Sequence, residues 1–262
     1  GQACTYRVER GGNHYALKLI FGKENMPPED WRQAVLRTKR ECGVLCEINH
    51  PNVVRAHATE LVGDLEDGYP YVVMDLIEGT TLEAWQQTHK PSLRAIAMVM
   101  ADLASALQAV HARNVFHRDI KSSNIIVRTS DHKPVLIDFG MVRTAIGRTA
   151  TQIGALAGTT THLAPEYIEG DIDHFAASDT YSLGYTLFVL VTGKPPFEYS
   201  KNFADRSMAS QDSELMQLTI QAVPRAPQSL NSNIPDDVAL VLLRLLDKKP
   251  ETRMTSVELE ET

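Results

Sequence analysis

The sequence contains few cysteines, and they are not placed to form a zinc site or a disulfide framework. Only Cys4, Cys42 and Cys46 occur among 262 residues, without a Cys-x-x-Cys or Cys/His cluster. Zinc sites and disulfide-stabilised scaffolds need such clusters or a denser set of cysteines. We therefore expect a reducing compartment: the cytoplasm, or the cytoplasmic domain of a membrane-anchored protein.

Long uninterrupted apolar runs are also missing. The most apolar stretches, Ile96–Val110, Thr186–Val191 and Val238–Leu246, are short or interrupted by charge at Asp102 and Arg244. A membrane-spanning helix needs about 20 predominantly apolar residues. We expect no membrane contact by this domain, and no signal peptide is recognisable.

An excess of positive charge is absent too. Lys and Arg total 26 against 33 Asp and Glu, a net charge of −7, so we expect no nucleic-acid partner. The 43% hydrophobic and 23% charged residues are ordinary for a folded soluble protein. The length allows one large domain or two coupled small ones.

The pattern of short elements changes near residue 78. Before it, β-like runs alternate with turns around one amphipathic stretch, and after it long apolar helical patterns dominate. We expect an α+β fold, with a small sheet-rich part at 1–78 and a large, mainly helical part at 79–262. The expected strands are Thr5–Arg10, His14–Phe21, Val53–Leu61 and Tyr69–Leu76, and the expected helices are Trp31–Ile48, Leu93–Ala112, Ser178–Thr192 and Val238–Asp247.

Polar residues suited to chemistry flank two short apolar runs in the second part. His117-Arg118-Asp119, Lys121 and Asn124 precede one run, and Asp138-Phe139-Gly140 follows the other. Two hairpin arms would bring these groups to one place. The oxygens of Asn124 and Asp138 are hard ligands of the kind that Mg²⁺ prefers, and Asp119 is left over as a base.

These motifs resemble the eukaryotic-type (Hanks-type) serine/threonine protein kinase family. Its catalytic loop reads H-R-D-x-K-x-x-N and its metal loop D-F-G. Ala164-Pro165-Glu166 and the strand ending in Ala16-Leu17-Lys18 occur in family order. The resemblance covers nearly the whole chain and implies the bilobal kinase fold, ATP, and Mg²⁺ or Mn²⁺.

The resemblance also implies a catalytic set. Asp119 accepts the proton of the substrate hydroxyl, and Asn124 and Asp138 hold the metal ion against the ATP phosphates. Lys18 contacts the α and β phosphates, and Glu41 is implied as its helical ion-pair partner.

Further motif positions are implied to fix the acceptor and the scaffold. Lys121 marks the serine/threonine branch, in which Thr159 bonds Asp119 and Lys121. Glu166 is implied to pair with Arg253, and Asp179 to brace the catalytic loop.

The nucleotide pocket follows from the same alignment. Counting back from Lys18 places Ala3 at the third glycine of the glycine-rich loop, so we expect a domain cut from a longer protein, with its first two glycines before residue 1. Met74 takes the gatekeeper position and predicts a restricted back pocket. The implied cofactor-binding residues are Gly1, Ala3, Thr5, Ala16, Lys18, Met74, Asp75, Ile77 and Ile126.

Regulation and substrate choice are less fully specified. Arg118 and Arg143 match basic positions that clamp an activation-segment phosphate, and we expect autophosphorylation in a transient dimer at Thr151 first or Thr149 second. An unmodified Thr-rich loop is the alternative. The places that carry acids in arginine-preferring kinases hold Ser123, Thr81 and Val189, so no strong preference for basic substrates is expected.

Three functions remain open at this point. The first is an active kinase acting on serine and threonine of protein substrates. The second is a pseudokinase or scaffold that binds partners without phosphoryl transfer, which the incomplete glycine-rich loop allows. The third is a small-molecule phosphotransferase, which the Ala164-Pro165-Glu166 motif disfavours.

Overall fold

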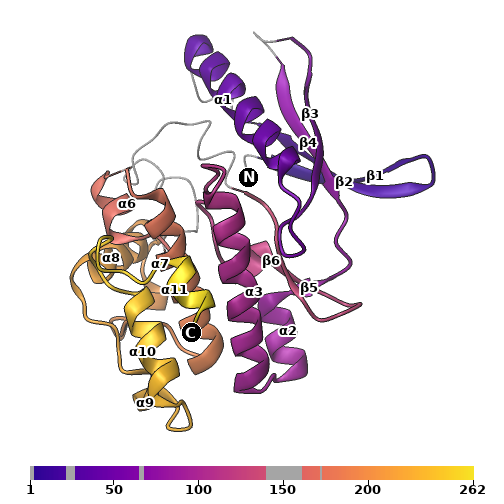
Figure 1. Ribbon diagram of the computed structural model, residues 1–262. Helices are drawn as coiled ribbons and strands as arrows, with labels where there is room; N and C mark the ends of the chain where they lie inside the picture. Colours follow the sequence, from indigo (N-terminus) through magenta and orange to yellow (C-terminus); the bar gives the residue numbers. More distant parts are fainter. Residues whose placement is uncertain (1–2, 22–26, 65–67, 140–160, 172) are drawn as a thin grey trace.

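A four-stranded antiparallel sheet forms the N-terminal part of the molecule (Figure 1). The computed structural model describes residues 3–21, 27–64, 68–139, 161–171 and 173–262. The strand order is β1-β2-β4-β3, where β1 is Ala3–Arg10, β2 Asn13–Ile20, β3 Ala56–Val62 and β4 Tyr69–Asp75. The expected strands are all present in this sheet.

The hairpin between β1 and β2 is closed by two glycines. Arg10 pairs with Asn13, so only Gly11 and Gly12 lie in the turn. Their φ angles are +60° and +80°, a left-handed conformation that glycine adopts without steric cost. The Gly-Gly pair therefore explains why the chain reverses here.

One long helix, α1, covers the sheet. It runs from Pro28 to Glu47, beginning three residues before the expected start because Pro28 fits the first helical turn. Its buried side chains recur at spacings of three and four residues and include Trp31 and Cys42. Trp31 also donates from its indole Nε1 to the carbonyl of Gly68 at 3.1 Å, which fixes the helix against the start of β4.

The C-terminal part is mainly helical and begins with a second, small sheet. Its strands are β5 (Gly79–Thr81), β6 (Ile125–Arg128) and β7 (Pro134–Leu136), in that order. Around them lie α2 (Leu82–His89), α3 (Leu93–His111), the 3-10 turn η2 (Ser122–Asn124), α6 (Pro165–Glu169), α7 (Phe175–Thr192), η4 (Phe203–Asp205), α8 (Met208–Gln221), α9 (Pro227–Leu230), α10 (Asp236–Leu245) and α11 (Ser256–Glu260). A single chain of sheet followed by helices confirms the α+β class.

The two parts meet through backbone hydrogen bonds. The amide of Val54 donates to the carbonyl of Leu136 at 2.9 Å, and the amide of Leu136 donates to the carbonyl of Asn52 at 2.8 Å. The segment between α1 and β3 is thereby tied to β7. This tie holds the four-stranded sheet next to the hairpin that carries the polar motifs.

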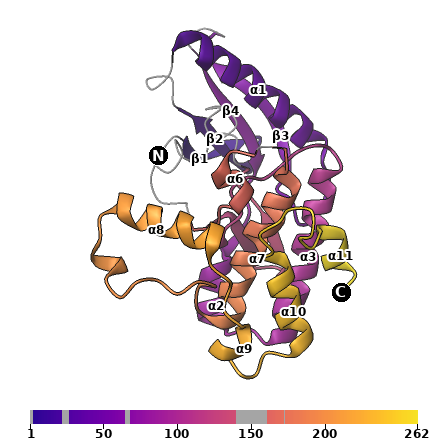
Figure 2. The same cartoon turned by 90° about the vertical axis from the view of Figure 1, so that its left-hand side faces the viewer.

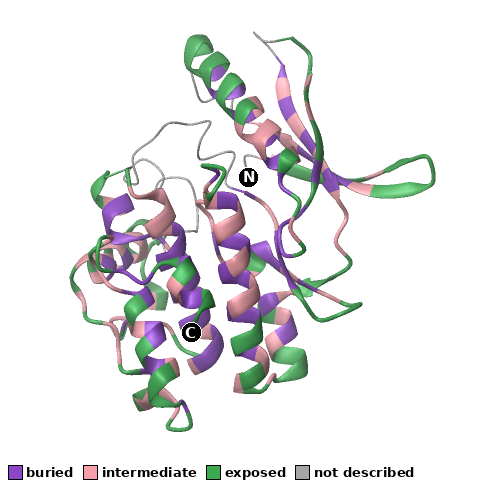
Figure 3. Cartoon of the chain, in the orientation of Figure 1, coloured by how far each residue is buried: buried purple, intermediate pink, exposed green. Residues whose placement is uncertain are grey.

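Helix α7 is the centre of the C-terminal core. Most of its residues are buried, as expected for a helix that is apolar on every face, and Figure 3 shows the burial running along it. Gly184 of α7 lies so close to α10 that a Cβ there would stand 2.5 Å from the Cβ of Leu245. In Figure 2, α8 projects from this core on the side away from α3 and α11.

Helix α3 corrects the expectation that no stretch of the chain is long and apolar enough to span a membrane. It has 19 residues with mean hydropathy 1.5, long and apolar enough by length and composition to cross a membrane, although Asp102 lies within it. Many of its apolar residues, including Leu103 and Leu107, belong to the core cluster, whereas Met98 is 63% exposed, so α3 packs against the core with one face. Asp102 does not interrupt the helix. Its Oδ1 lies 3.9 Å from Lys133 Nζ, where both side chains are partly exposed to solvent.

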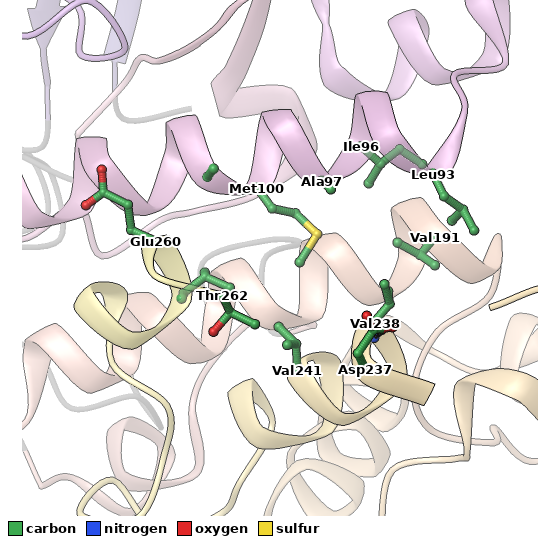
Figure 4. A pocket seen from close by; sticks show the side chains of 12 residues that line it. Leu93, Ile96, Ala97, Met100, Val191, Asp237, Val238, Val241, Glu260 and Thr262 are labelled. Carbon is green, nitrogen blue, oxygen red and sulfur yellow. Dashed lines mark hydrogen bonds between the residues drawn. The ribbon is translucent and has the colours of Figure 1, made fainter. Parts of the chain in front are cut away.

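An apolar cavity of about 210 Å³ lies between α3, α7, α10 and α11. Figure 4 shows the side chain of Met100 extending from α3 toward Val241, with Asp237 and Glu260 at opposite ends. None of the candidate catalytic residues lines this cavity, so it is separate from the site described next.

Candidate active site

The loop between α3 and β6 is held in place by one buried carboxylate. Asp179 of α7 accepts hydrogen bonds from the backbone amides of His117 at 2.8 Å and Arg118 at 2.7 Å, and from His111 Nε2 at 2.9 Å. Burial alone would raise the pKa of Asp179, but the hydrogen bond from His111 and the amides lower it below its ordinary value. The prediction that Asp179 braces the catalytic loop is confirmed.

His117 orients the same loop from inside. Its Nε2 donates to the carbonyl of Ile137 at 2.9 Å, and its Nδ1 accepts from the amide of Asp119 at 3.3 Å. This arrangement requires the neutral imidazole, and burial lowers the pKa of His117 below its ordinary value. The ring also packs on Phe139, with centroids 4.7 Å apart. One side chain therefore joins the two arms that carry Asp119 and Asp138.

Three predicted site residues meet at the carboxylate of Asp119. The side-chain nitrogen of Asn124 donates to Asp119 Oδ2 at 2.9 Å and to its backbone carbonyl at 2.8 Å. Lys121 Nζ lies 2.9 Å from the same Oδ2. The Lys121 ammonium and the Asn124 amide together hold the partly buried Asp119 carboxylate in one orientation.

A fourth residue of the set comes from the four-stranded sheet. Lys18 of β2 is 5% exposed and its ammonium forms an ion pair with Oδ1 of Asp138. Asp138 has φ +64°, an uncommon left-handed conformation for a residue with a side chain, and such strain concentrates at functional sites. The pair joins residues that are 120 positions apart and lie in different parts of the molecule.

The ion pair implied between Lys18 and Glu41 is wrong for this conformation. Among the described residues, Glu41 pairs instead with Arg118, whose Nη1 lies 3.1 and 3.2 Å from the two carboxylate oxygens. The guanidinium is held there by the face of Phe175, 4.4 Å from the ring centroid. Since Lys18 already has Asp138 as its acidic partner, each cation is satisfied without the expected pair.

The predicted adenine walls lie at the junction of the two sheets. Ala16 and Met74 are Cα partners on β2 and β4, with 8% and 7% exposure. Ile126 lies on β6 opposite Thr81 of β5. Asp75 ends β4, and Ile77 lies in the stretch that leads from it to β5.

The glycine-rich-loop positions lie on β1. Thr5 is the Cα partner of Lys18, and Ala3 is the partner of Ile20. Gly1 lies outside the described residues, as do Gly140, Arg143, Thr149, Thr151 and Thr159. The predictions made for those positions therefore stay predictions.

The donor chemistry fits a divalent hard cation. The nitrogen of the Asn124 amide is turned toward Asp119, so the oxygen of that amide is the atom available to a ligand. Asp138 supplies carboxylate oxygens on the facing arm. No cluster of three His, Cys, Asp or Glu suited to a metal occurs in the described part of the chain.

The predicted pair of Glu166 and Arg253 is confirmed. Arg253 Nη1 and Nη2 lie 2.6 and 2.8 Å from the two carboxylate oxygens of Glu166, and both side chains are buried. The pair ties α6 to the segment before α11. The pair stabilises the packing of α6 and does not contact Asp119, Asn124 or Asp138 among the interactions of the described residues.

Two of these contacts could not be predicted from the order of residues along the chain. His111 and Arg118 find their partners Asp179 and Glu41 at separations of 68 and 77 residues. Pairing these residues requires knowing which elements lie next to one another in the folded chain.

Comparisons with known proteins agree with this geometry. The family model of the protein kinase domain matches residues 1–262, and the chain belongs to the protein kinase family. The chain is similar to serine/threonine-protein kinase PkaA of Streptomyces coelicolor, with 33% identity over 251 residues that cover 95% of this chain and 42% of that protein. It is also similar to serine/threonine-protein kinase PknB of Mycobacterium tuberculosis, with 34% identity over 223 residues that cover 83% of this chain and 33% of that protein.

A solved structure shares the fold. The crystal structure of Rad53 1-466 in complex with AMP-PNP superposes with a TM-score of 0.74 at 23% identity, covering 99% of this chain and 61% of that one. The chain spans between a third and about two-fifths of the length of the two curated relatives.

Proposed function

We propose that this chain transfers the γ-phosphoryl group of ATP to serine and threonine hydroxyls of protein substrates. One observation carries the proposal: Asp119, Asn124 and Asp138 converge from two arms of one hairpin, and Lys18 of the other lobe reaches Asp138. The lobes are 1–78 and 79–262. A pseudokinase is disfavoured because Lys18, Glu41, Asp119, Asn124 and Asp138 are all present, although Glu41 pairs with Arg118 rather than with Lys18.

Each residue has a role in this proposal. Asp119 accepts the hydroxyl proton, and Lys121 stabilises the carboxylate and the incoming charge. Asn124 and Asp138 would hold Mg²⁺, or Mn²⁺ in its place, which neutralises charge on the ATP phosphates. Glu41 acts as a positioning residue through Arg118, the neighbour of the base.

The nucleotide is proposed to lie between the two sheets. Ala16 and Met74 form the upper wall, and Ile126 forms the lower one. The backbone of Asp75 and Ile77 bonds the adenine edge, while Lys18 and the loop before and within β1, including Gly1, Ala3 and Thr5, cover the phosphates.

A groove beside the catalytic loop supports a substrate preference without a strong requirement for basic residues. It measures about 450 Å³ and is lined by residues of α2, η2 and α7, with Ser122, Val189 and Tyr199 among them. Among the described residues that line it, Glu83 is the only acidic one and none is Lys or Arg. A positional peptide array should accordingly show no dominant arginine requirement near the acceptor, and such a requirement would overturn this preference.

Autophosphorylation at Thr151, or at Thr149 in second place, within a transient dimer belongs to the same proposal. We place the chain in the cytoplasm or in the cytoplasmic domain of a membrane-anchored protein. The three free cysteines support a reducing compartment, and burial raises the pKa of the Cys42 thiol to about 12, which keeps that thiol unreactive.

The test is Mg-ATP turnover by the full-length protein on itself and on a generic protein acceptor. Asp119→Asn should lower the rate by about 10²–10⁴, because positioned proton transfer contributes that much. Asp131→Asn is the matched control, since Asp131 lies exposed in the β6–β7 turn and pairs only locally with Arg128. Equal turnover by wild type and Asp119→Asn would reject the mechanism, and no turnover by wild type would favour a pseudokinase.

A further inference from the structure

Strand β3 contains an irregularity next to the predicted adenine site. It pairs antiparallel with β4, with Ala56 opposite Met74 and Ala58 opposite Val73. His57 is therefore the extra residue of a β-bulge. A bulge bends its strand and redirects a side chain, and bulges are over-represented next to active sites.

The redirected side chain of His57 contacts Asp75, the last residue of β4. The imidazole Nε2 donates to Asp75 Oδ1 at 2.6 Å, a short charge-assisted hydrogen bond. The edge of the His57 ring also meets the Tyr15 ring, with centroids 5.3 Å apart and planes at 82°. Tyr15 is itself the Cα partner of Asp75, so the three side chains form one cluster across β2, β3 and β4.

Asp75 is held through its backbone as well. Its amide donates to the carbonyl of Arg55 at 3.0 Å, just before the bulge. The two anchors fix the amide and the side chain of Asp75 against the same short segment, residues 55–57. The carbonyl of Asp75 is the group of this residue that is proposed to meet adenine.

We propose that His57 is a positioning residue for nucleotide binding: through Asp75 it orients the backbone of residues 75–77 toward the adenine edge. This rests on the proposed function, since it assumes that ATP binds at this strand end. His57 itself does not touch the nucleotide. Its contribution is to adenine affinity, while the phosphate contacts made by Lys18 and Asp138 are independent of it.

The experiment separates adenine binding from phosphate binding. In the full-length protein, His57→Leu removes the donor, His57→Gln keeps an amide N–H at similar reach, and His14→Leu is the control for an exposed histidine on the same sheet. The measurements are KM for ATP, kcat, and the inhibition constants of adenosine and of tripolyphosphate.

His57→Leu should raise KM for ATP and weaken adenosine binding by about two- to five-fold, the range for a partly exposed polar pair of side chains, with kcat within about two-fold of wild type. The side chains of His57 and Asp75 are 34% and 45% exposed, which sets that modest range. Inhibition by tripolyphosphate should not change, and His57→Gln should restore most of the adenosine affinity. Asp75→Ala, which removes the acceptor, should weaken adenosine binding similarly, and adding His57→Leu to it should cause little further loss.

Other outcomes overturn the inference. Unchanged adenosine affinity in His57→Leu, or an equal loss of tripolyphosphate affinity, would show that His57 does not act on the adenine side. A loss of the same size in His14→Leu would show a general effect on the sheet. If wild type binds ATP and turns it over while these variants behave like wild type, only this inference fails; if wild type binds no adenosine, the proposed function fails with it.

Discussion

Removal of Arg253 should be the most destabilising of the simple side-chain truncations around the site. All five guanidinium hydrogens are used: two bonds reach Glu166, and three reach the carbonyls of Ala177, Asp247 and Lys248. The Arg253 side chain is fully inaccessible and that of Glu166 is 4% exposed. Neither charge can recover solvation if its partner is removed.

The magnitude follows from that burial. Taking away one partner of a buried pair leaves an uncompensated charge and costs about 3–5 kcal/mol. Because domains of this size are stable by only about 5–15 kcal/mol, Arg253→Met should remove about a fifth or more of the free energy of unfolding. Arg253→Lys keeps the charge but loses the planar two-pronged contact, so its loss should be smaller.

Urea denaturation of wild type and variants measures these differences. The double variant Glu166→Leu/Arg253→Met should lose less than the sum of the two single variants, since no buried charge is then left alone. Arg244→Met is the matched control: Arg244 pairs with Glu258 at 2.8 Å, but the two side chains are 44% and 45% exposed, and the expected loss is about 1 kcal/mol or less. A loss below about 1 kcal/mol for Arg253→Met, or strict additivity in the double variant, would refute the reasoning.

Two further predictions concern the core behind the site. Burial holds the folded-state pKa of His117 below its ordinary value of 6.5, so the unfolded chain takes up the proton first as the pH falls. The free energy of unfolding should therefore decrease as pH drops below about 6.5. Urea midpoints measured across that range test this, and midpoints that do not change with pH would contradict it. Gly184→Ala should cost about 1–3 kcal/mol and lower the melting temperature, because the new Cβ would collide with Leu245. Gly43→Ala, in open space on α1, should be neutral or stabilising, and equal effects of the two substitutions would argue against the packing explanation.

Much of the site could be predicted because its chemistry is local in the chain. Asp119, Lys121 and Asn124 lie within six residues, and their side chains meet directly. Asp138 follows the next strand of the same hairpin, so adjacency along the chain becomes adjacency in space. The same holds for the β1–β2 hairpin, where Gly11 and Gly12 alone determine the turn.

Partners across the fold could not be predicted with the same certainty. The motif alignment assigned Lys18 to Glu41, but the structure pairs Lys18 with Asp138 and Glu41 with Arg118. Several acids lie within reach of these cations, and the choice depends on where α1 stands relative to the catalytic loop. Such a choice is made by packing, and no local pattern encodes it.

The sequence alone thus determined the family resemblance, the α+β class and the composition of the catalytic loop, since each depends on residue types at short spacings. Tertiary structure decided which charges pair, which residues of α3 are buried in the core, and that one extra residue in β3 turns His57 onto Asp75. The physical reason is the same in each case. A shift in strand register or in the position of a helix changes which distant groups come into contact. The interaction energies of those groups depend on their burial and separation, which are set only in the folded chain.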